Sequence, residues 1–139
     1  MGPNYALITG ASKGLGKVFA DALAVRGRDL ILVARSTSEL ETLANELKTL
    51  RGIKVETFTH DLAAPGAGVN LASELAERGL DIDLLVNNAG FGERGEFCEL
   101  PLGRQLQMIY LHNSAVVELT YELLKPMIAR QNELSATIR

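Results

Sequence analysis

The residues with the clearest chemical meaning form a glycine-rich segment near the N-terminus. The segment runs Thr9-Gly10-Ala11-Ser12-Lys13-Gly14-Leu15-Gly16, between an apolar run and an amphipathic stretch. Gly10 permits a tight turn, Gly14 lets backbone amides approach a pyrophosphate, and Gly16 lets the following helix pack close to a sheet. The start of that helix offers unpaired N–H groups and a partial positive charge to an anion. The segment therefore predicts a phosphate-binding loop made by Gly10, Ser12, Lys13, Gly14, Leu15 and Gly16.

The spacing of the glycines separates this loop from two related motifs. It is not a Walker A loop, because Gly10 and Gly16 are one residue too far apart and Val18 stands where Ser or Thr is required. Its form is T-G-x-x-x-G-x-G, which also differs from G-x-G-x-x-G. A glycine-rich turn that binds nothing is the alternative interpretation.

A basic residue stands where many dinucleotide-binding domains have an acidic one. Arg35 follows Gly16 by 19 residues, at a place where Asp or Glu would accept hydrogen bonds from ribose hydroxyls. An arginine there is expected to pair with a 2′-phosphate, Lys13 could reach the same phosphate, and Ser36 could add a hydroxyl donor. Two cations and no acid favour NADP over NAD. The alternative is that Arg35 is a solvated residue at the end of a strand.

Polar residues also follow two other apolar runs. Asp61-Leu62 follows the third run, and Asn87-Asn88-Ala89-Gly90 follows the fourth. Ligands of open parallel sheets bind beyond the carboxyl ends of the strands, so these segments are candidates for the same site. Asp61 could instead be a turn residue or helix cap, and Asn88 could be a strand-end residue that satisfies backbone groups.

The elements that must position these residues alternate along the chain. Short apolar runs at 5–9, 29–34, 55–59 and 82–86 predict buried strands, and amphipathic stretches between them predict helices. Ser36 and Ser38 can cap the second helix, and Gly52 can end it. A long helical pattern spans 103–130, with Pro126 expected to kink it or restart its last turn. The alternation predicts an α/β fold with a doubly wound parallel sheet.

Composition limits the classes of function. The 139 residues are 47% hydrophobic and 22% charged, which suits one domain over residues 1–139. A net charge of −3 with interleaved signs argues against nucleic acid or a membrane surface as partner. With one cysteine, Cys98, and two histidines, no disulfide and no metal site are expected. No signal peptide or membrane-spanning run is predicted, so a cytoplasmic protein is expected.

Taken together, the three motifs resemble the short-chain dehydrogenase/reductase family, with its T-G-x-x-x-G-x-G and N-N-A-G elements. The resemblance extends from Thr9 to about Met127. It implies a Rossmann-type fold and hydride transfer between a nicotinamide cofactor and a small-molecule carbonyl or alcohol. It also implies that Asp61 and Leu62 contact adenine and that Asn88, Ala89 and Gly90 lie beside the cofactor ribose. Family members pack the long helix against another subunit, which implies a homo-oligomer.

The family's catalytic residues are not found at matching positions. The family uses a Ser, a Tyr with a Lys four residues later, and a helix Asn that relays protons. Tyr121-x-x-x-Lys125 is rejected as that pair, because it lies inside the long helix and Met108 stands where the Ser should be. The relay position falls on His112 rather than Asn113, and either side chain could serve. A surface or interface histidine is the alternative.

After Arg130 the sequence has no pattern typical of a fifth strand. We therefore expect a sheet truncated after the fourth strand and the following long helix, without the Ser/Tyr/Lys segment, and with the fourth strand as an apolar edge. The leading hypothesis is an NADP-dependent short-chain dehydrogenase/reductase. The alternatives are a non-catalytic dinucleotide-binding module and a dimerisation unit.

Overall fold

The computed structural model describes residues 4–130 and 136–137. A parallel sheet in the order β3-β2-β1-β4-β5 forms its centre. The four predicted strands are confirmed as β1 (Asn4–Thr9), β2 (Asp29–Ala34), β3 (Val55–Thr59) and β4 (Asp81–Asn87). The helices are α1 (Gly14–Val25), α2 (Thr37–Arg51), α3 (Ala67–Glu77), α4 (Leu102–Ile109) and α5 (Ala115–Ala129).

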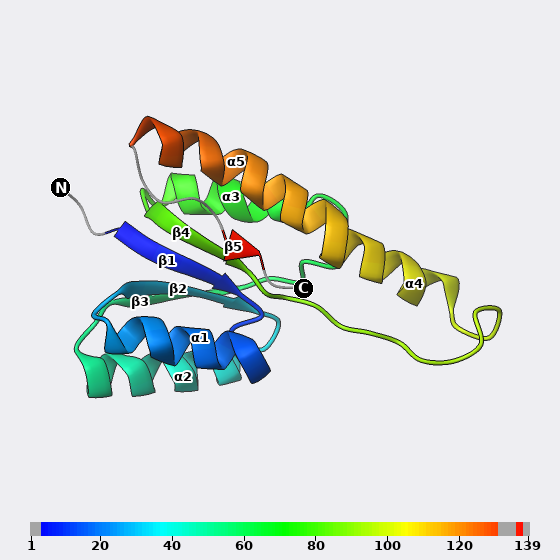
Figure 1. The fold of residues 1–139 in the computed structure, drawn as a ribbon, viewed down its shortest axis with the longest axis horizontal. Helices are drawn as coiled ribbons and strands as arrows, with labels where there is room; N and C mark the ends of the chain where they lie inside the picture. Colours follow the sequence, from blue (N-terminus) through cyan, green and yellow to red (C-terminus); the bar gives the residue numbers. More distant parts are fainter. Residues whose placement is uncertain (1–3, 131–135, 138–139) are drawn as a thin grey trace.

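Helices cover both faces of the sheet (Figure 1). One face carries α1 and α2, and the other carries α3 and α5. Successive residues of a strand point to opposite faces, so each strand supplies two cores. Leu7 and Ile31 enter the core under α3 and α5, whereas Ile8 and Leu30 enter the core under α1 and α2. The strands are continuously apolar because neither face of the sheet meets solvent.

The structure differs from the sequence prediction beyond Arg130. A two-residue strand, β5 (Ala136–Thr137), pairs in parallel with Val86 and Asn87 of β4. The predicted sheet of four strands followed by a long helix is present, and β5 adds one short pairing at its edge, where no fifth strand was expected. Two residues are too few to show an alternating or continuously apolar pattern, so β5 leaves no periodic signal in the sequence.

The long helical pattern at 103–130 is interrupted by a π-helical turn. This turn, η1 (Tyr110–Ser114), lies between α4 and α5, and the N–H of Ala115 donates to the carbonyl oxygen of Tyr110. Helix α5 runs through Pro126 to Ala129, so Pro126 does not end it. Single π turns within helices occur frequently at functional sites. The turn contains His112 and Asn113, the two candidates for the relay position.

The predicted caps of α2 are confirmed at both ends. The Oγ of Ser36 accepts a hydrogen bond from the backbone N–H of Glu39 at 3.4 Å. Gly52 ends the helix in the left-handed conformation, with φ of 67°. Ser38 is not the capping residue. The Ser36 cap fixes where Glu39 leaves the first turn of α2.

Helices α3 and α5 meet at a close contact around Gly68. The Oε2 of Glu118 in α5 accepts hydrogen bonds from the N–H groups of Gly68, at 2.9 Å, and Val69, at 3.2 Å. A Cβ on Gly68 would lie 2.7 Å from the Cβ of Glu118 and 2.9 Å from the carbonyl oxygen of Ala115. A carboxylate from another helix thus caps the N-terminus of α3, where negative charge is stabilising. Within the described residues, no helix is long and apolar enough to cross a membrane.

Candidate functional site

A cavity of about 650 Å³ lies at the carboxyl ends of the strands. All the predicted cofactor-binding residues line it except Gly16, and they come from the segments that follow β1, β2, β3 and β4. The structure thus brings together segments separated by up to 80 residues in the chain. The lining residues are Gly10, Ser12, Lys13, Gly14, Leu15, Val33, Ala34, Arg35, Ser36, Glu39, His60, Asp61, Leu62, Ala63, Asn88, Ala89, Gly90, Phe91 and Leu111.

Thr9 joins the glycine loop to the segment that follows β4. Its side chain is buried, and its Oγ1 accepts hydrogen bonds from the backbone N–H groups of Asn88 and Ala89, each at 3.0 Å. The same hydroxyl donates to the carbonyl oxygen of Val86 at 3.4 Å. One hydroxyl therefore uses both its donor and its acceptor capacity to hold two motifs together.

Asn88 makes the reciprocal connection. Its Nδ2 donates to the carbonyl oxygens of Thr9, at 3.1 Å, and Gly10, at 3.2 Å. The alternative interpretation of Asn88, a strand-end residue that satisfies backbone groups, therefore describes its side chain correctly. The residue also lines the cavity, so it holds the glycine loop in place beside the space that a ligand would occupy.

Two glycines are required by close approach around Asn88. A Cβ on Gly16 would lie 2.0 Å from the carbonyl oxygen of Gly10 and 2.6 Å from Nδ2 of Asn88. A Cβ on Gly10 would lie 2.8 Å from the Cα of Ala89. Neither position can accept a side chain without moving backbone. The role predicted for Gly16, close packing of α1 against the sheet, agrees with this geometry.

The N-terminus of α1 is available to an anion. Its N-cap, Lys13, makes no side-chain capping bond, and the first turn has no acidic residue. No described atom lies within 4 Å of a Cβ built on Gly14, so the loop is open at that residue. Uncapped backbone N–H groups at a helix start suit a phosphate group. The loop thus fits the diphosphate of a dinucleotide cofactor.

The lining of the cavity includes both predicted cations, but it also includes an acid. Lys13 Nζ lies 3.4 Å from Oε1 of Glu39, and Glu39 lines the cavity. The premise that no acidic residue stands near the two cations is therefore wrong. The cause is the helical geometry of α2, because Ser36 caps the helix and Glu39 leaves its first turn three residues later. Among the described residues, Arg35 is exposed and forms no ion pair.

Asp61 makes a local turn at the cavity wall. Its Oδ1 accepts a hydrogen bond from the N–H of Ala63 at 3.0 Å, which is the turn interpretation given as the alternative to adenine contact. The side chain is exposed, whereas Leu62 beside it is buried and lines the cavity. The turn fixes the direction of the chain where it passes the cavity.

His60 belongs to the same wall and was not among the predicted cofactor-binding residues. Its Nε2 lies 2.7 Å from Oε2 of Glu74, and Oε1 of Glu74 accepts a bond from Arg78 at 2.8 Å. The hydrogen bond from His60, assisted by the charges of His60 and Arg78, lowers the pKa of the Glu74 carboxyl below its ordinary value. The guanidinium of Arg78 in turn lies 4.3 Å from the centre of the Phe58 ring.

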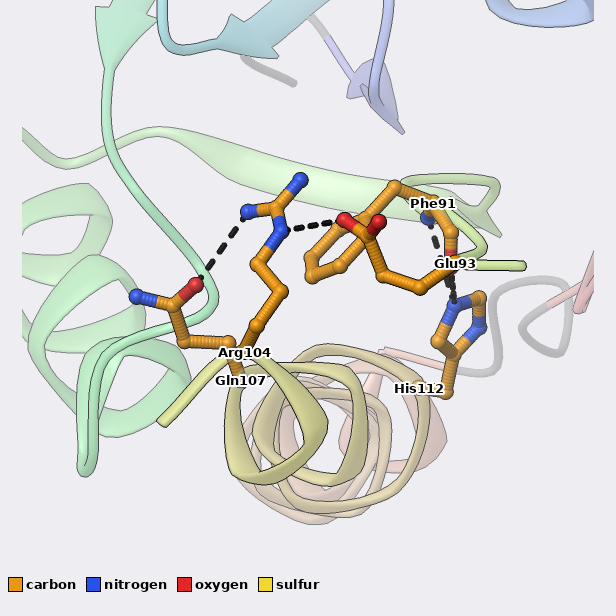
Figure 2. A network of polar contacts seen from close by, with 5 residues as sticks. All are labelled: Phe91, Glu93, Arg104, Gln107 and His112. Atoms are coloured by element: carbon orange, nitrogen blue, oxygen red, sulfur yellow. Dashed lines mark hydrogen bonds and ion pairs between the residues drawn. The ribbon is translucent and has the colours of Figure 1, made fainter. Parts of the chain in front are cut away.

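His112 contacts the backbone next to the cavity rather than the cavity itself (Figure 2). Its Nε2 lies 2.7 Å from the carbonyl oxygen of Phe91 and 3.3 Å from the backbone nitrogen of the same residue, so the imidazole is held against the Phe91 backbone. A Cβ on Gly90 would lie 2.6 Å from Cε1 of His112, so the imidazole occupies the space that the missing side chain leaves. Asn113 is exposed, and neither residue lines the cavity.

Phe91 is held from a second side by α4. The Cζ of Arg104 lies 3.8 Å from the centre of the Phe91 ring. The same guanidinium forms an ion pair with Glu93 and donates to Oε1 of Gln107 at 3.2 Å. Figure 2 shows this network around the Phe91 ring and the His112 imidazole, which occupies a separate position near the Phe91 backbone. The segment after β4 is thus attached to both α4 and η1.

Tyr121 and Lys125 lie away from the cavity. Lys125 Nζ is 4.0 Å from the centre of the Tyr121 ring, and both residues are on the exposed side of α5. The contact with the Tyr121 hydroxyl raises the pKa of Lys125. The pair is therefore a surface contact. No cluster of residues able to hold a metal ion exists in the described part of the chain.

Comparison with known proteins identifies the family. Residues 4–134 match the short chain dehydrogenase family, which is nearly the whole chain. The chain belongs to the short-chain dehydrogenase family. This membership agrees with the resemblance found in the glycine loop and the N-N-A-G element.

Curated relatives are similar over the same span. The chain is 37% identical over 139 residues to the very-long-chain 3-oxoacyl-CoA reductase of Phaeosphaeria nodorum, covering 96% of this chain and 40% of that protein. It is 33% identical over 137 residues to the human 17-beta-hydroxysteroid dehydrogenase type 3, covering 96% of this chain and 43% of that protein. The chain thus spans less than half the length of these relatives.

Solved structures share the fold. A short-chain dehydrogenase from Sphingobium yanoikuyae in complex with NADPH has a TM-score of 0.88 and 31% identity, over 96% of this chain and 52% of that one. L-sorbose reductase from Gluconobacter frateurii, complexed with NADPH and L-sorbose, has a TM-score of 0.88 and 29% identity, over 99% of this chain and 52% of that one. Both structures contain NADPH.

Proposed function

We propose that this chain is the NADP-binding part of an oxidoreductase that transfers hydride between the nicotinamide cofactor and a carbonyl or alcohol. One observation carries the proposal. The glycine loop, Arg35, Ser36 and the Asn88–Gly90 segment all line the same cavity. The cofactor, when bound, supplies the hydride chemistry.

The residues of the chain have separable tasks in this proposal. The N-terminus of α1 and the loop at Gly14 hold the diphosphate. Arg35 and Lys13 supply positive charge for the 2′-phosphate, and the Ser36 hydroxyl can donate to it. Thr9 and Asn88 keep the two halves of this wall in register through the hydrogen bonds between them. All of these tasks bind and orient the cofactor, and none of them moves a proton.

For the substrate, we propose a ketone or secondary alcohol on an apolar skeleton. The relatives matched by the chain include a 3-oxoacyl-CoA reductase and a 17-beta-hydroxysteroid dehydrogenase. Phe91, which lines the cavity between His112 and Arg104, offers an apolar surface beside it.

We further propose a cytoplasmic homo-oligomer. Exposed apolar side chains along α4 and α5 support the association: Leu102, Leu106, Ile109, Val117, Tyr121 and Ile128. Sedimentation as a monomer would count against it.

A non-catalytic dinucleotide-binding module is the second candidate. It is favoured by the position of Tyr121 and Lys125 on the surface of α5, and by the absence of His112 and Asn113 from the described lining of the cavity. In that case the chain binds the cofactor and acts through a partner.

The experiment that separates these candidates measures binding and turnover in the same sample. NADPH is titrated into the protein by following its fluorescence, and a 3-oxoacyl-CoA or a steroid ketone is then added while NADPH consumption is recorded. Saturable binding with ketone-dependent consumption supports the oxidoreductase. Binding without consumption supports the module, and a lack of binding contradicts both.

A further inference from the structure

The lining of the cavity contains an acidic residue beside the two cations proposed to bind the 2′-phosphate. Glu39 lines the cavity together with Lys13, Arg35 and Ser36. Its Oε1 lies 3.4 Å from Nζ of Lys13. One of the two cations therefore already has a partner before any ligand is bound.

The ion pair between Lys13 and Glu39 is easily displaced. The side chains are 79% and 41% exposed, respectively, and ion pairs between exposed groups are weak because water screens them. A phosphate dianion is a stronger partner for an ammonium group than one carboxylate is. Lys13 can therefore exchange Glu39 for a phosphate.

The backbone of Glu39 is held in place, whereas its side chain has space to change conformation. Its backbone N–H donates to Ser36 Oγ, which holds the first turn of α2 against the segment that begins at Arg35. Glu39 also lines a second hollow of about 260 Å³, together with Ser12 and Lys17. Because Ser12 and Glu39 line both hollows, the carboxylate can turn away from the larger one without a change in α2.

The two forms of the cofactor meet Glu39 differently. A 2′-phosphate placed between Arg35 and Lys13 would lie close to the Glu39 carboxylate, and the two negative groups would repel each other. The phosphate would also replace Glu39 as the partner of Lys13. A free ribose hydroxyl can instead donate a hydrogen bond to the Glu39 carboxylate. Glu39 thus opposes the form with the phosphate and favours the form without it.

We propose that Glu39 is a specificity-determining residue that weakens the preference for NADP over NAD by competing with the 2′-phosphate for Lys13. The proposal rests on the proposed function, because it requires that the cavity bind the dinucleotide. In this arrangement Arg35 causes the preference for NADP over NAD, and Glu39 makes that preference smaller.

The test is calorimetric titration of the Glu39→Gln variant with NADPH and, separately, with NADH. Glutamine keeps the size of the side chain and removes its charge. We expect the Kd for NADPH to fall about fivefold and the Kd for NADH to stay equal or rise, which corresponds to about 1 kcal/mol of specificity. Glu41→Gln is the matched control, because Glu41 is exposed on α2 and lies outside both cavity linings, so it should change neither Kd.

A second variant keeps the test independent of folding. Lys13→Met should weaken NADPH binding more in the Glu39→Gln background than in the wild type, because Lys13 then has no competing partner. The inference is overturned if Glu39→Gln changes the Kd for NADPH and the Kd for NADH equally. It is also overturned if Lys13→Met changes the Kd for NADPH equally in both backgrounds. Either result leaves the proposed function standing. Failure of the wild type to bind either dinucleotide overturns the proposed function, and the inference falls with it.

Discussion

The hydroxyl of Thr9 accepts hydrogen bonds from the backbone N–H groups of Asn88 and Ala89, while the Asn88 amide donates to the carbonyl oxygen of Thr9. These two residues are separated by 79 positions in the chain. Their mutual bonds fix the end of β1 to the end of β4, and so they set the distance between the glycine loop and the Asn88–Gly90 wall of the cavity.

Replacing Thr9 with valine should destabilise the protein strongly. Valine keeps the shape of the side chain but leaves the N–H groups of Asn88 and Ala89 without their acceptor. Each unsatisfied buried group costs about 1–3 kcal/mol, so the free energy of unfolding should fall by about 2–4 kcal/mol. Urea denaturation measures the change. Thr9→Ser should retain most of the stability, and Thr42→Val, on an exposed helix surface, should cost less than about 0.5 kcal/mol. Equal losses for Thr9→Val and Thr9→Ser would contradict this account.

A side chain at position 90 should conflict with His112. The Cβ of Gly90→Ala would lie 2.6 Å from the imidazole, which must then move and lose its bond to Phe91. We expect a loss of about 1–2 kcal/mol in the free energy of unfolding. In the double variant Gly90→Ala/His112→Ala, the effects should be non-additive, because the alanine at 90 no longer meets the ring. Gly92→Ala, where a Cβ meets no described atom within 4 Å, is the control. Additive losses would show that the two residues do not interact.

Removal of the Glu118 carboxylate should loosen α3 from α5. In Glu118→Ala the N–H groups of Gly68 and Val69 lose their acceptor at the N-terminus of α3. Loss of a helix cap costs about 0.5–2 kcal/mol, and thermal unfolding should show a lower Tm. Glu122→Ala, on the exposed side of the same helix, should leave the Tm nearly unchanged. If both variants had the same Tm as the wild type, the cap would contribute nothing.

Glu74 should make part of the stability depend on pH in the acid range. Its pKa is lowered in the folded state by His60 and Arg78, so its contribution is present above the ordinary value of 4.5 and is lost as the pH falls through the folded pKa. At neutral pH, Glu74→Gln should lower the free energy of unfolding by less than about 1 kcal/mol, because the pair is partly exposed. The difference from the wild type should vanish in acid, as measured by urea titrations across pH. Glu77→Gln, which is exposed, is the control, and a difference that persists unchanged in acid would refute the assignment.

Local patterns predicted the four long strands and the residues at their carboxyl ends. Each apolar run is stopped by a glycine or polar segment, and parallel pairing brings those segments to one edge. Patterns did not predict β5, because two residues carry no period, or η1, because a π turn differs from an α-helical turn by one residue in its hydrogen bonding. Glu39 was missed as a cavity residue because only the first turn of α2 places its carboxylate opposite Lys13. The signal in the sequence was an acidic residue, Glu39, three positions after the capping Ser36 and therefore in the first turn of the helix.

The central claim is that the cavity binds a dinucleotide through its 2′-phosphate, and the most direct test compares NADPH with NADH by equilibrium titration of the wild type and Arg35→Ala. The wild type should bind NADPH more tightly. Arg35→Ala should raise the Kd for NADPH by about 10- to 100-fold, because a hydrogen bond to a charged group contributes about 1.5–3 kcal/mol, while the Kd for NADH should change less than about twofold. If NADH binds the wild type as tightly as NADPH does, or if Arg35→Ala weakens both equally, the assignment of Arg35 to the 2′-phosphate is contradicted.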